Sequence, residues 1–440
     1  MRSLQARLRR VLPATAQERG VAEWAFAYFF ALLAANYVLR PLRDQMGIAG
    51  GVRNLPWLFT ATFLALLLAQ PLYGALVARW ARARFIPFVY HFFAANLAIF
   101  WLLLTLNVAP VGVARAFFVW VGVFNLFVVA VFWSLMADIF TSEQSERLFG
   151  FISAGGTAGS LLGPLITIGL SARLGPVNLL IAAAALLELA VLCVHRLEHG
   201  AATMNRDIAR APAAEVAKPS ASIKIGGSAF GGLTEILRSP YLAGIALWVS
   251  LFSFAGTFLY LQQANIVAAT IHDRAAQTRL FASIDLAVGL IALATQILIT
   301  GRVIKRFGVA PAAAALPTVY VIGFGALAFV SNLAAVVTVQ VIQRSTNFAL
   351  SNPARHILFT VVAREEKYKA KNMIDVVVYR GSDALWGAVF GAAQAIGLQI
   401  AAIAACALPV ALGWFVLSVA LGRTQEQRAA RIDSQTRQEA

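Results

Sequence analysis

Long apolar runs separated by short polar tracts form the pattern of hydrophobic and polar positions along the chain. The runs recur from Val21 to Leu421, and each has roughly the 20 residues that carry a helix across the hydrocarbon core of a bilayer. Helices are predicted at residues 21–45, 55–78, 85–107, 110–139, 147–171, 176–196, 240–268, 280–301, 311–331, 333–362, 373–397 and 400–421. The pattern therefore predicts an all-α membrane protein with twelve transmembrane helices.

The basic residues alternate between the two ends of these helices. Of the 36 Lys and Arg residues, 26 lie in the N-terminus, the even-numbered loops and the C-terminal tail, counting Arg147 and Arg196 at the helix ends that border these loops, whereas the odd-numbered loops hold only Arg53, Arg173, Arg274 and Arg279. Because Lys and Arg accumulate on the cytoplasmic side, both termini are predicted to be cytoplasmic. We expect a multi-pass protein of the cell inner (plasma) membrane.

A polar stretch rich in Ala, Pro, Ser and Gly divides the chain. We predict a cytoplasmic N-terminus (1–20), a six-helix half (21–196), a cytoplasmic linker (197–238), a second six-helix half (239–422) and a cytoplasmic tail (423–440). An internal repeat supports this division, because GALVARWA at Gly74–Ala81 resembles GRVIKRFG at Gly301–Gly308. Two six-helix halves resemble the plan of the major facilitator superfamily, whose substrate sites lie near the bilayer midplane.

Composition narrows the class of function. The chain is 60% hydrophobic and only 13% charged, and its net charge of +16 is spread over short loops, so no nucleic-acid-binding domain is predicted. Cys193 and Cys406 lie in apolar runs and indicate neither a disulfide nor a metal site. The sequence shows no nucleophile and base pair and no cofactor loop. We therefore expect no enzyme activity, metal or cofactor.

Polar and charged residues inside the predicted helices are the candidates for a functional site, because each is costly in lipid unless it faces protein or water. In the first helix Asn36, Arg40 and Arg43 share one face, beside Tyr37. They are candidate substrate-binding residues. The alternative is that both Arg side chains reach lipid headgroups at the membrane surface.

A second polar group occupies the tenth and eleventh helices. The candidate substrate-binding residues there are Arg344, Asn347, Ser351, Asn352, Arg355 and Arg380. Arg344, Asn347 and Ser351 fall on one face of an α-helix, which favours the lining of a cavity. Arg380 has the alternative of an ion pair with Asp383, three residues later.

These guanidinium groups predict a positively charged cavity that binds an anion, because Arg can donate two hydrogen bonds to a phosphate or carboxylate. Asp285 lies in an apolar run without a charged neighbour. It is a candidate proton-coupling carboxyl, and the alternative is a partner Arg from another helix. The small residues of AGGTAGSLLG, at Ala154–Gly163, predict close helix packing instead of a phosphate loop.

Three blocks resemble the ATP/ADP translocase family of plastids and intracellular bacteria. They are NYVLRPLRD at Asn36–Asp44, FWSLMADIFTSEQSERLFG at Phe132–Gly150 and ALSNPARHILFTVVAREEKYKAKNMID at Ala349–Asp375. The resemblance implies that Arg43 and Arg355 stand where the family places Lys residues against nucleotide phosphates. Pro41, Leu42 and His356 depart from its pattern, so a different phosphorylated or carboxylated metabolite is compatible.

The leading hypothesis is an alternating-access secondary transporter of an anionic metabolite, with nucleotide exchange of the ATP/ADP type as its specific form. A proton-coupled exporter of a small metabolite or drug is the second hypothesis. A non-transporting membrane scaffold or receptor is the third. The expected partners are an anionic small molecule, a nucleotide among the candidates, and the lipid bilayer, with the protein as a monomer.

Overall fold

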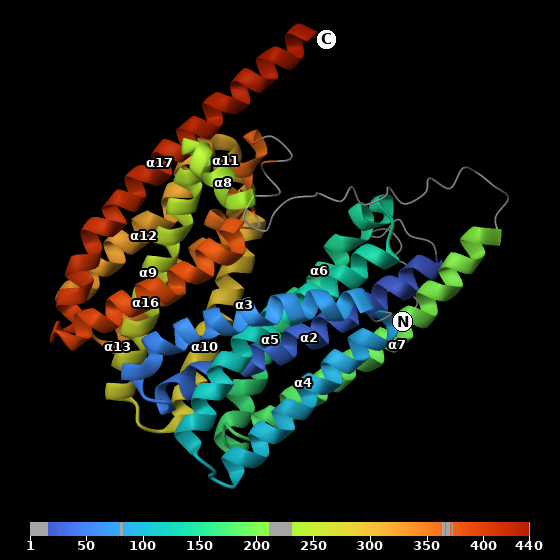
Figure 1. Ribbon diagram of the computed structural model, residues 1–440, viewed down its shortest axis with the longest axis horizontal. Coiled ribbons are helices and arrows are strands. Elements are labelled where there is room, and N and C mark those ends of the chain that lie inside the picture. The colour runs from blue at the N-terminus through green and yellow to red at the C-terminus, as the bar shows by residue number, and fades with distance from the viewer. Residues whose placement is uncertain are drawn as a thin grey trace. The chain divides into compact units, whose positions relative to one another are not determined.

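The computed structural model describes residues 16–79, 82–210, 231–362, 366, 370, 371 and 373–439. Every regular element in these residues is a helix (Figure 1), as the sequence predicts. The first fifteen residues of the predicted N-terminal segment and residues 211–230 of the predicted linker lie outside the described residues.

Before the linker the helices are α2 (Ala16–Ala49), η1 (Val52–Asn54), α3 (Leu55–Arg79), α4 (Arg82–Thr105), α5 (Pro110–Ile139), α6 (Ser142–Leu174) and α7 (Leu179–Arg210). After it come α8 (Gly231–Arg238), α9 (Pro240–Thr270), α10 (Arg274–Thr295), η2 (Gln296–Thr300), α11 (Gly301–Phe307), α12 (Val309–Phe329), α13 (Leu333–Thr346), η3 (Asn347–Ser351), α14 (Asn352–Leu358), η4 (Phe359–Val361), η5 (Met373–Val378), α16 (Tyr379–Ala395) and α17 (Ile400–Glu439). Within the described residues, ten helical segments are long and apolar enough to cross a membrane.

The other two predicted spans are built from shorter pieces. Residues 333–361 form α13, the π-helix η3, α14 and the 3₁₀-helix η4 in succession, and the π-helix η5 precedes α16. A π turn widens the helix by one residue and is frequent at functional sites. The polar residues that mark these spans in the sequence therefore coincide with their departures from α-helical geometry.

Contacts among Cα atoms divide the chain into two compact units. The N-terminal unit extends to Met46 and includes the residues from Ala65 to the linker together with Asp273–Leu286. The C-terminal unit contains Gly47–Leu64, the residues from the linker to His272, and those from Ala287 onward. The predicted boundaries of the two halves, 21–196 and 239–422, stay a prediction.

In the N-terminal unit, α2 and α6 approach each other backbone to backbone. A methyl group added at Gly159 would lie 2.2 Å from the carbonyl oxygen of Phe30, and one added at Gly155 would lie 2.4 Å from that of Phe26. Only glycine permits this distance, so the close packing predicted from AGGTAGSLLG is confirmed. Local sequence also sets the start of α6, where Thr141 and Gln144 form a capping box.

In the C-terminal unit, side chains form hydrogen bonds with backbone groups at irregular turns and at helix ends. Gln296 and Thr300 of η2 donate to the carbonyl oxygens of Phe348 and Ala349 in η3, at 3.0 and 2.8 Å. The two π-helices are therefore joined side by side. Helices α12 and α17 also lie side by side (Figure 1), and Glu426 of α17 accepts hydrogen bonds from the first amide groups of α12.

Large apolar side chains remain exposed along many of these helices. Leu68 and Leu72 of α3, Ile297 of η2 and Phe329 of α12 are between 65% and 91% exposed. Water would penalise such surfaces, whereas lipid tails solvate them. Length, composition and exposure therefore agree on a multi-pass membrane protein.

We expect Gly159→Ala to lower the stability of the protein, because its methyl group would collide with the backbone of α2. The cost should be about 1–3 kcal/mol, the usual penalty of overpacking. Thermal unfolding of the detergent-solubilised protein measures it. Gly169→Ala is the matched control, since a methyl group at Gly169 of the same helix meets nothing within 4 Å. Equal melting temperatures for the two variants would contradict the close packing.

Candidate functional site

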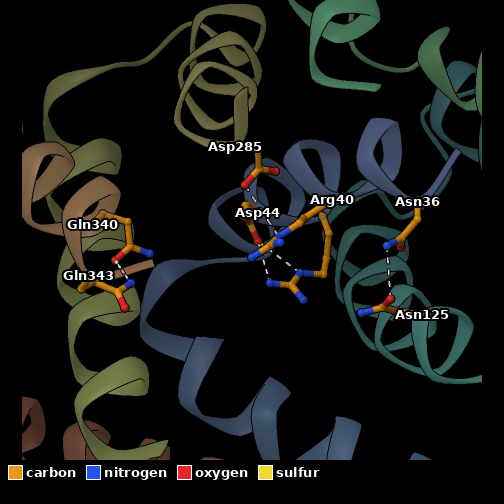
Figure 2. Close-up of polar contacts among 8 residues, drawn as sticks. Asn36, Arg40, Asp44, Asn125, Asp285, Gln340 and Gln343 are labelled. Carbon is orange, nitrogen blue, oxygen red and sulfur yellow. Dashed lines mark hydrogen bonds and ion pairs between the residues drawn. The ribbon is translucent and has the colours of Figure 1, made fainter. Parts of the chain in front are cut away.

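The polar face predicted on α2 is a real feature of the N-terminal unit. Asn36 is buried, and its amide nitrogen donates to the side-chain oxygen of Asn125 on α5 at 3.2 Å (Figure 2). Tyr37 lies one residue on and its ring contacts the guanidinium group of Arg40, 5.7 Å from the ring centroid. The sequence could have indicated Asn125, because it is an amide within an apolar run, but the prediction considered mainly ionisable residues.

Arg40 forms an ion pair with Asp285, which α10 contributes to the same unit. Arg40 Nε lies 3.8 Å from a carboxylate oxygen of Asp285 (Figure 2). The Asp285 side chain is 1% exposed, whereas that of Arg40 is 30% exposed. Of the two alternatives for Asp285, the structure shows the partner Arg from another helix.

Arg43 is held by its chain neighbour. Its Nε and Nη2 atoms lie 3.1 and 2.8 Å from the same oxygen of Asp44, and its guanidinium group lies over the Phe118 ring at 5.0 Å. Arg40 and Arg43 thus each contact an acidic side chain. These contacts argue against the alternative in which both side chains extend to lipid headgroups.

Arg355 and Arg380 of the C-terminal unit are paired with carboxylates in the same way. Arg355 lies 3.7 Å from Asp375, which also binds Lys371 at 2.5 Å. Arg380 lies 3.3 Å from Asp383, so the ion pair given as the alternative for Arg380 is present. Ser253 donates a further hydrogen bond to Asp383.

Two sequence expectations need correction. The expected excess of positive charge is not observed around Arg40, Arg43, Arg355 and Arg380, because each lies within 4 Å of a carboxylate. The α-helical spacing used for Arg344, Asn347 and Ser351 does not apply either, because Asn347–Ser351 is a π-helix. Arg344 lies in the last turn of α13 and Asn352 begins α14, so these polar residues lie within the π-helix and on either side of it.

Buried amides in the C-terminal unit were missed by the sequence prediction. Tyr320 donates to Gln343 at 2.9 Å, and Gln343 donates to Gln340 at 3.1 Å (Figure 2). Gln262 of α9 is fully buried, and within the described residues neither of its side-chain polar atoms has a hydrogen-bond partner. A buried amide without partners is costly, which makes Gln262 a candidate for contact with water or substrate. The glutamine pair Gln262 and Gln263 within an apolar span was the available signal.

The side chains of the site suit the binding of organic or inorganic anions and the movement of protons. Guanidinium groups can bind phosphate or carboxylate. Within the described residues, no group of three or more His, Cys, Asp or Glu side chains is placed to hold a metal ion.

A family model described as Major Facilitator Superfamily matches residues 21–370. The chain belongs to the major facilitator superfamily. Solved structures with the same fold include a bacterial homologue of the iron transporter ferroportin, with a TM-score of 0.65 and 11% identity over 93% of this chain and 100% of that one. They also include the nucleoside transporter NupG, with a TM-score of 0.58 and 15% identity over 92% of this chain and 98% of that one.

A bacterial homologue of the human lysosomal transporter Spinster has a TM-score of 0.52 and 12% identity over 95% of this chain and 98% of that one. At these identities the likeness shows the fold. Comparison with curated protein sequences gives no significant match. Family and fold together identify a membrane transporter of the major facilitator superfamily and not an enzyme.

We expect the Arg40 and Asp285 substitutions to be strongly non-additive. Asp285→Asn leaves a partly buried guanidinium group without its carboxylate, so this variant should unfold at a lower temperature than the Arg40→Gln/Asp285→Asn double variant. A double-mutant cycle should give a coupling of about 0.5–3 kcal/mol, the range for contacting residues.

The control for that cycle is Arg173→Gln in place of Arg40→Gln. Arg173 is exposed in the last turn of α6 and has no ion pair in the described part of the chain. Its effect should add to that of Asp285→Asn. Additive effects of Arg40→Gln and Asp285→Asn would show that their contact contributes nothing to stability.

Proposed function

We propose that this transporter moves an anionic metabolite by alternating access, with Arg40 and Arg43 of α2 as its principal anion contacts. The observation that carries the proposal is the partial exposure of these two Arg side chains together with their carboxylate contacts. Each is a cation within a membrane-spanning helix, each is partly accessible at 30% and 25% exposure, and each holds an internal carboxylate. Such a carboxylate occupies the place that a bound anion would take.

The geometry of the Arg40 contact favours exchange of one anion for another. Its 3.8 Å separation from Asp285 is longer than the 2.7–2.9 Å that is typical of a charge-assisted hydrogen bond. A phosphate or carboxylate whose oxygens accepted hydrogen bonds from Arg40 at the shorter distance would compete well. Asp285 would then be freed from Arg40 only while the substrate is bound.

Arg355 of the C-terminal unit is a further proposed anion contact. It shares Asp375 with Lys371, so an anion that displaced this carboxylate would meet two cations. Further candidate binding residues stay those whose polar side chains lie inside the predicted spans, where each is costly unless it faces protein or water, namely Arg344, Asn347, Ser351, Asn352 and Arg380.

A nucleotide is the specific anion suggested by the three blocks that resemble the ATP/ADP translocase family, and the mechanism would then be exchange. The fold shared with NupG, a nucleoside transporter by its name, is compatible with a ligand that contains a nucleoside. Location in the inner membrane, cytoplasmic termini and a monomeric state complete the proposal.

We expect Arg40→Gln, Arg43→Gln and Arg355→Gln to raise the substrate concentration needed for half-maximal uptake. A lost hydrogen bond to a charged group is worth about 1.5–3 kcal/mol, which corresponds to a tenfold or larger effect. Proteoliposomes loaded with unlabelled nucleotides or organic anions, and offered labelled ones, measure both uptake and its dependence on internal substrate. Arg173→Gln should transport like the wild type. Normal uptake by the Arg40 and Arg43 variants would eliminate this site.

Proton-coupled export of a small metabolite is the second candidate, and the burial of Asp285 favours it. A carboxyl that is 1% exposed and pairs with Arg40 can take up a proton when that Arg is drawn away. The proton would then replace the guanidinium group as the partner of the carboxylate.

Under this second function, we expect Asp285→Asn to abolish the stimulation of transport by an imposed pH gradient. Arg43→Gln should then have little effect, which distinguishes this function from anion exchange. Transport by proteoliposomes with and without the gradient provides the measurement. A pH-gradient response retained by Asp285→Asn would exclude Asp285 as the coupling group.

A further inference from the structure

A cavity of about 860 Å³ opens in the C-terminal unit, and none of the candidate residues discussed above lines it. Its walls come from three places far apart in the sequence, namely η1 with the start of α3, the last turns of α9, and the end of α16 with the residues that follow it. The residues that matter for its chemistry are Arg53, Trp57, Asn265, Gln394 and Gln399. The loops at residues 50–54 and 396–399 place it at the predicted non-cytoplasmic end of the helices.

The walls of this cavity are fixed by close packing. Pro56, at the start of α3, packs on α16, where methyl groups added at Gly387 and Gly391 would lie 3.3 Å from its atoms. Asn265 accepts a hydrogen bond from Gln394 at 3.2 Å, which joins α9 to α16. The cavity is therefore part of the fold of this unit.

The charge of the cavity is positive. Arg53 is the single charged residue among those that line it. Arg53 is exposed, and no ion pair involves it in the part of the chain that the structure describes. This distinguishes it from Arg40, Arg43, Arg355 and Arg380, which all contact carboxylates.

Both polar and apolar side chains line the cavity with Arg53. Trp57 is 66% exposed and carries an indole N–H, and Gln399 adds an exposed amide. Leu398, which also lines the cavity, is 37% exposed. A guanidinium group beside an exposed indole and amides is the combination found where proteins meet the headgroup region of a bilayer.

We propose that this cavity binds a phosphate group, supplied by the headgroup of a phospholipid. The planar guanidinium group of Arg53 suits the oxygens of a phosphate, and Gln399 and Trp57 provide further donors. The apolar surface of Trp57 and Leu398 accommodates the start of the acyl chains. This site is independent of the proposed transport site, because it shares no residue with it.

The test uses the full chain in detergent and measures its melting temperature with added lipid. Phosphatidylglycerol should raise the melting temperature, and a neutral glycolipid with the same acyl chains should not. Inorganic phosphate tests the soluble source of the same group. If inorganic phosphate raised the melting temperature and phosphatidylglycerol did not, the cavity would bind phosphate from a soluble anion, and the assignment to a phospholipid would be wrong.

Two variants locate the binding. Arg53→Gln should weaken phosphatidylglycerol binding by about tenfold, as expected for the loss of a charge-assisted hydrogen bond. Ala392→Trp should fill the cavity, because Ala392 lines it and is exposed. Arg53→Lys should retain part of the binding, and Arg173→Gln, an exposed Arg on the same predicted side, should retain all of it.

Native mass spectrometry gives a second readout that does not depend on unfolding. Wild-type protein should retain phosphatidylglycerol at lipid concentrations at which the Arg53→Gln variant has lost it. Equal retention by wild type, Arg53→Gln and Ala392→Trp would overturn the proposal. An equal response to the neutral glycolipid would overturn it as well.

Discussion

The contact between Arg40 and Asp285 shows the constraint that governs this molecule, which is the high cost of a bare charge inside a membrane-spanning helix. Asp285 is almost fully buried and Arg40 is partly exposed. Neither would be stable there alone, and in the pair each neutralises the charge of the other. The same solution recurs at Arg43, Arg355 and Arg380, each beside an acidic side chain.

The helices around these pairs follow from the need to satisfy every backbone group in lipid. Where regular α-helix gives way to π-helix, side chains supply the missing hydrogen bonds, as Gln296 and Thr300 do for η3. Where two backbones must meet, α6 presents glycines to α2. The charged face of α2 is therefore carried on a helix with little freedom to shift on its neighbour.

Apolar periodicity predicted the helical architecture because hydrocarbon thickness fixes the length of each span. The close packing of α6 and the ion pair of Arg380 with Asp383 could also be inferred from the sequence. Each depends on residues that lie within one or two turns of a single helix. The partner of Asp285 could not be chosen from the sequence, because nothing local indicates which distant helix lies opposite. The π-helices were missed because the side-chain spacing was interpreted with the 3.6-residue repeat of an α-helix.

The origin of Asp285 in α10, well after the linker, has a consequence for how the protein is made. Chains enter the membrane from the N-terminus as they are synthesised, so α2 is inserted long before α10 leaves the ribosome. Until then Arg40 lacks the carboxylate that neutralises it in the finished molecule. The N-terminal unit therefore completes its charge balance only late in biogenesis, and a chain truncated at the linker would contain the cation without its counterion.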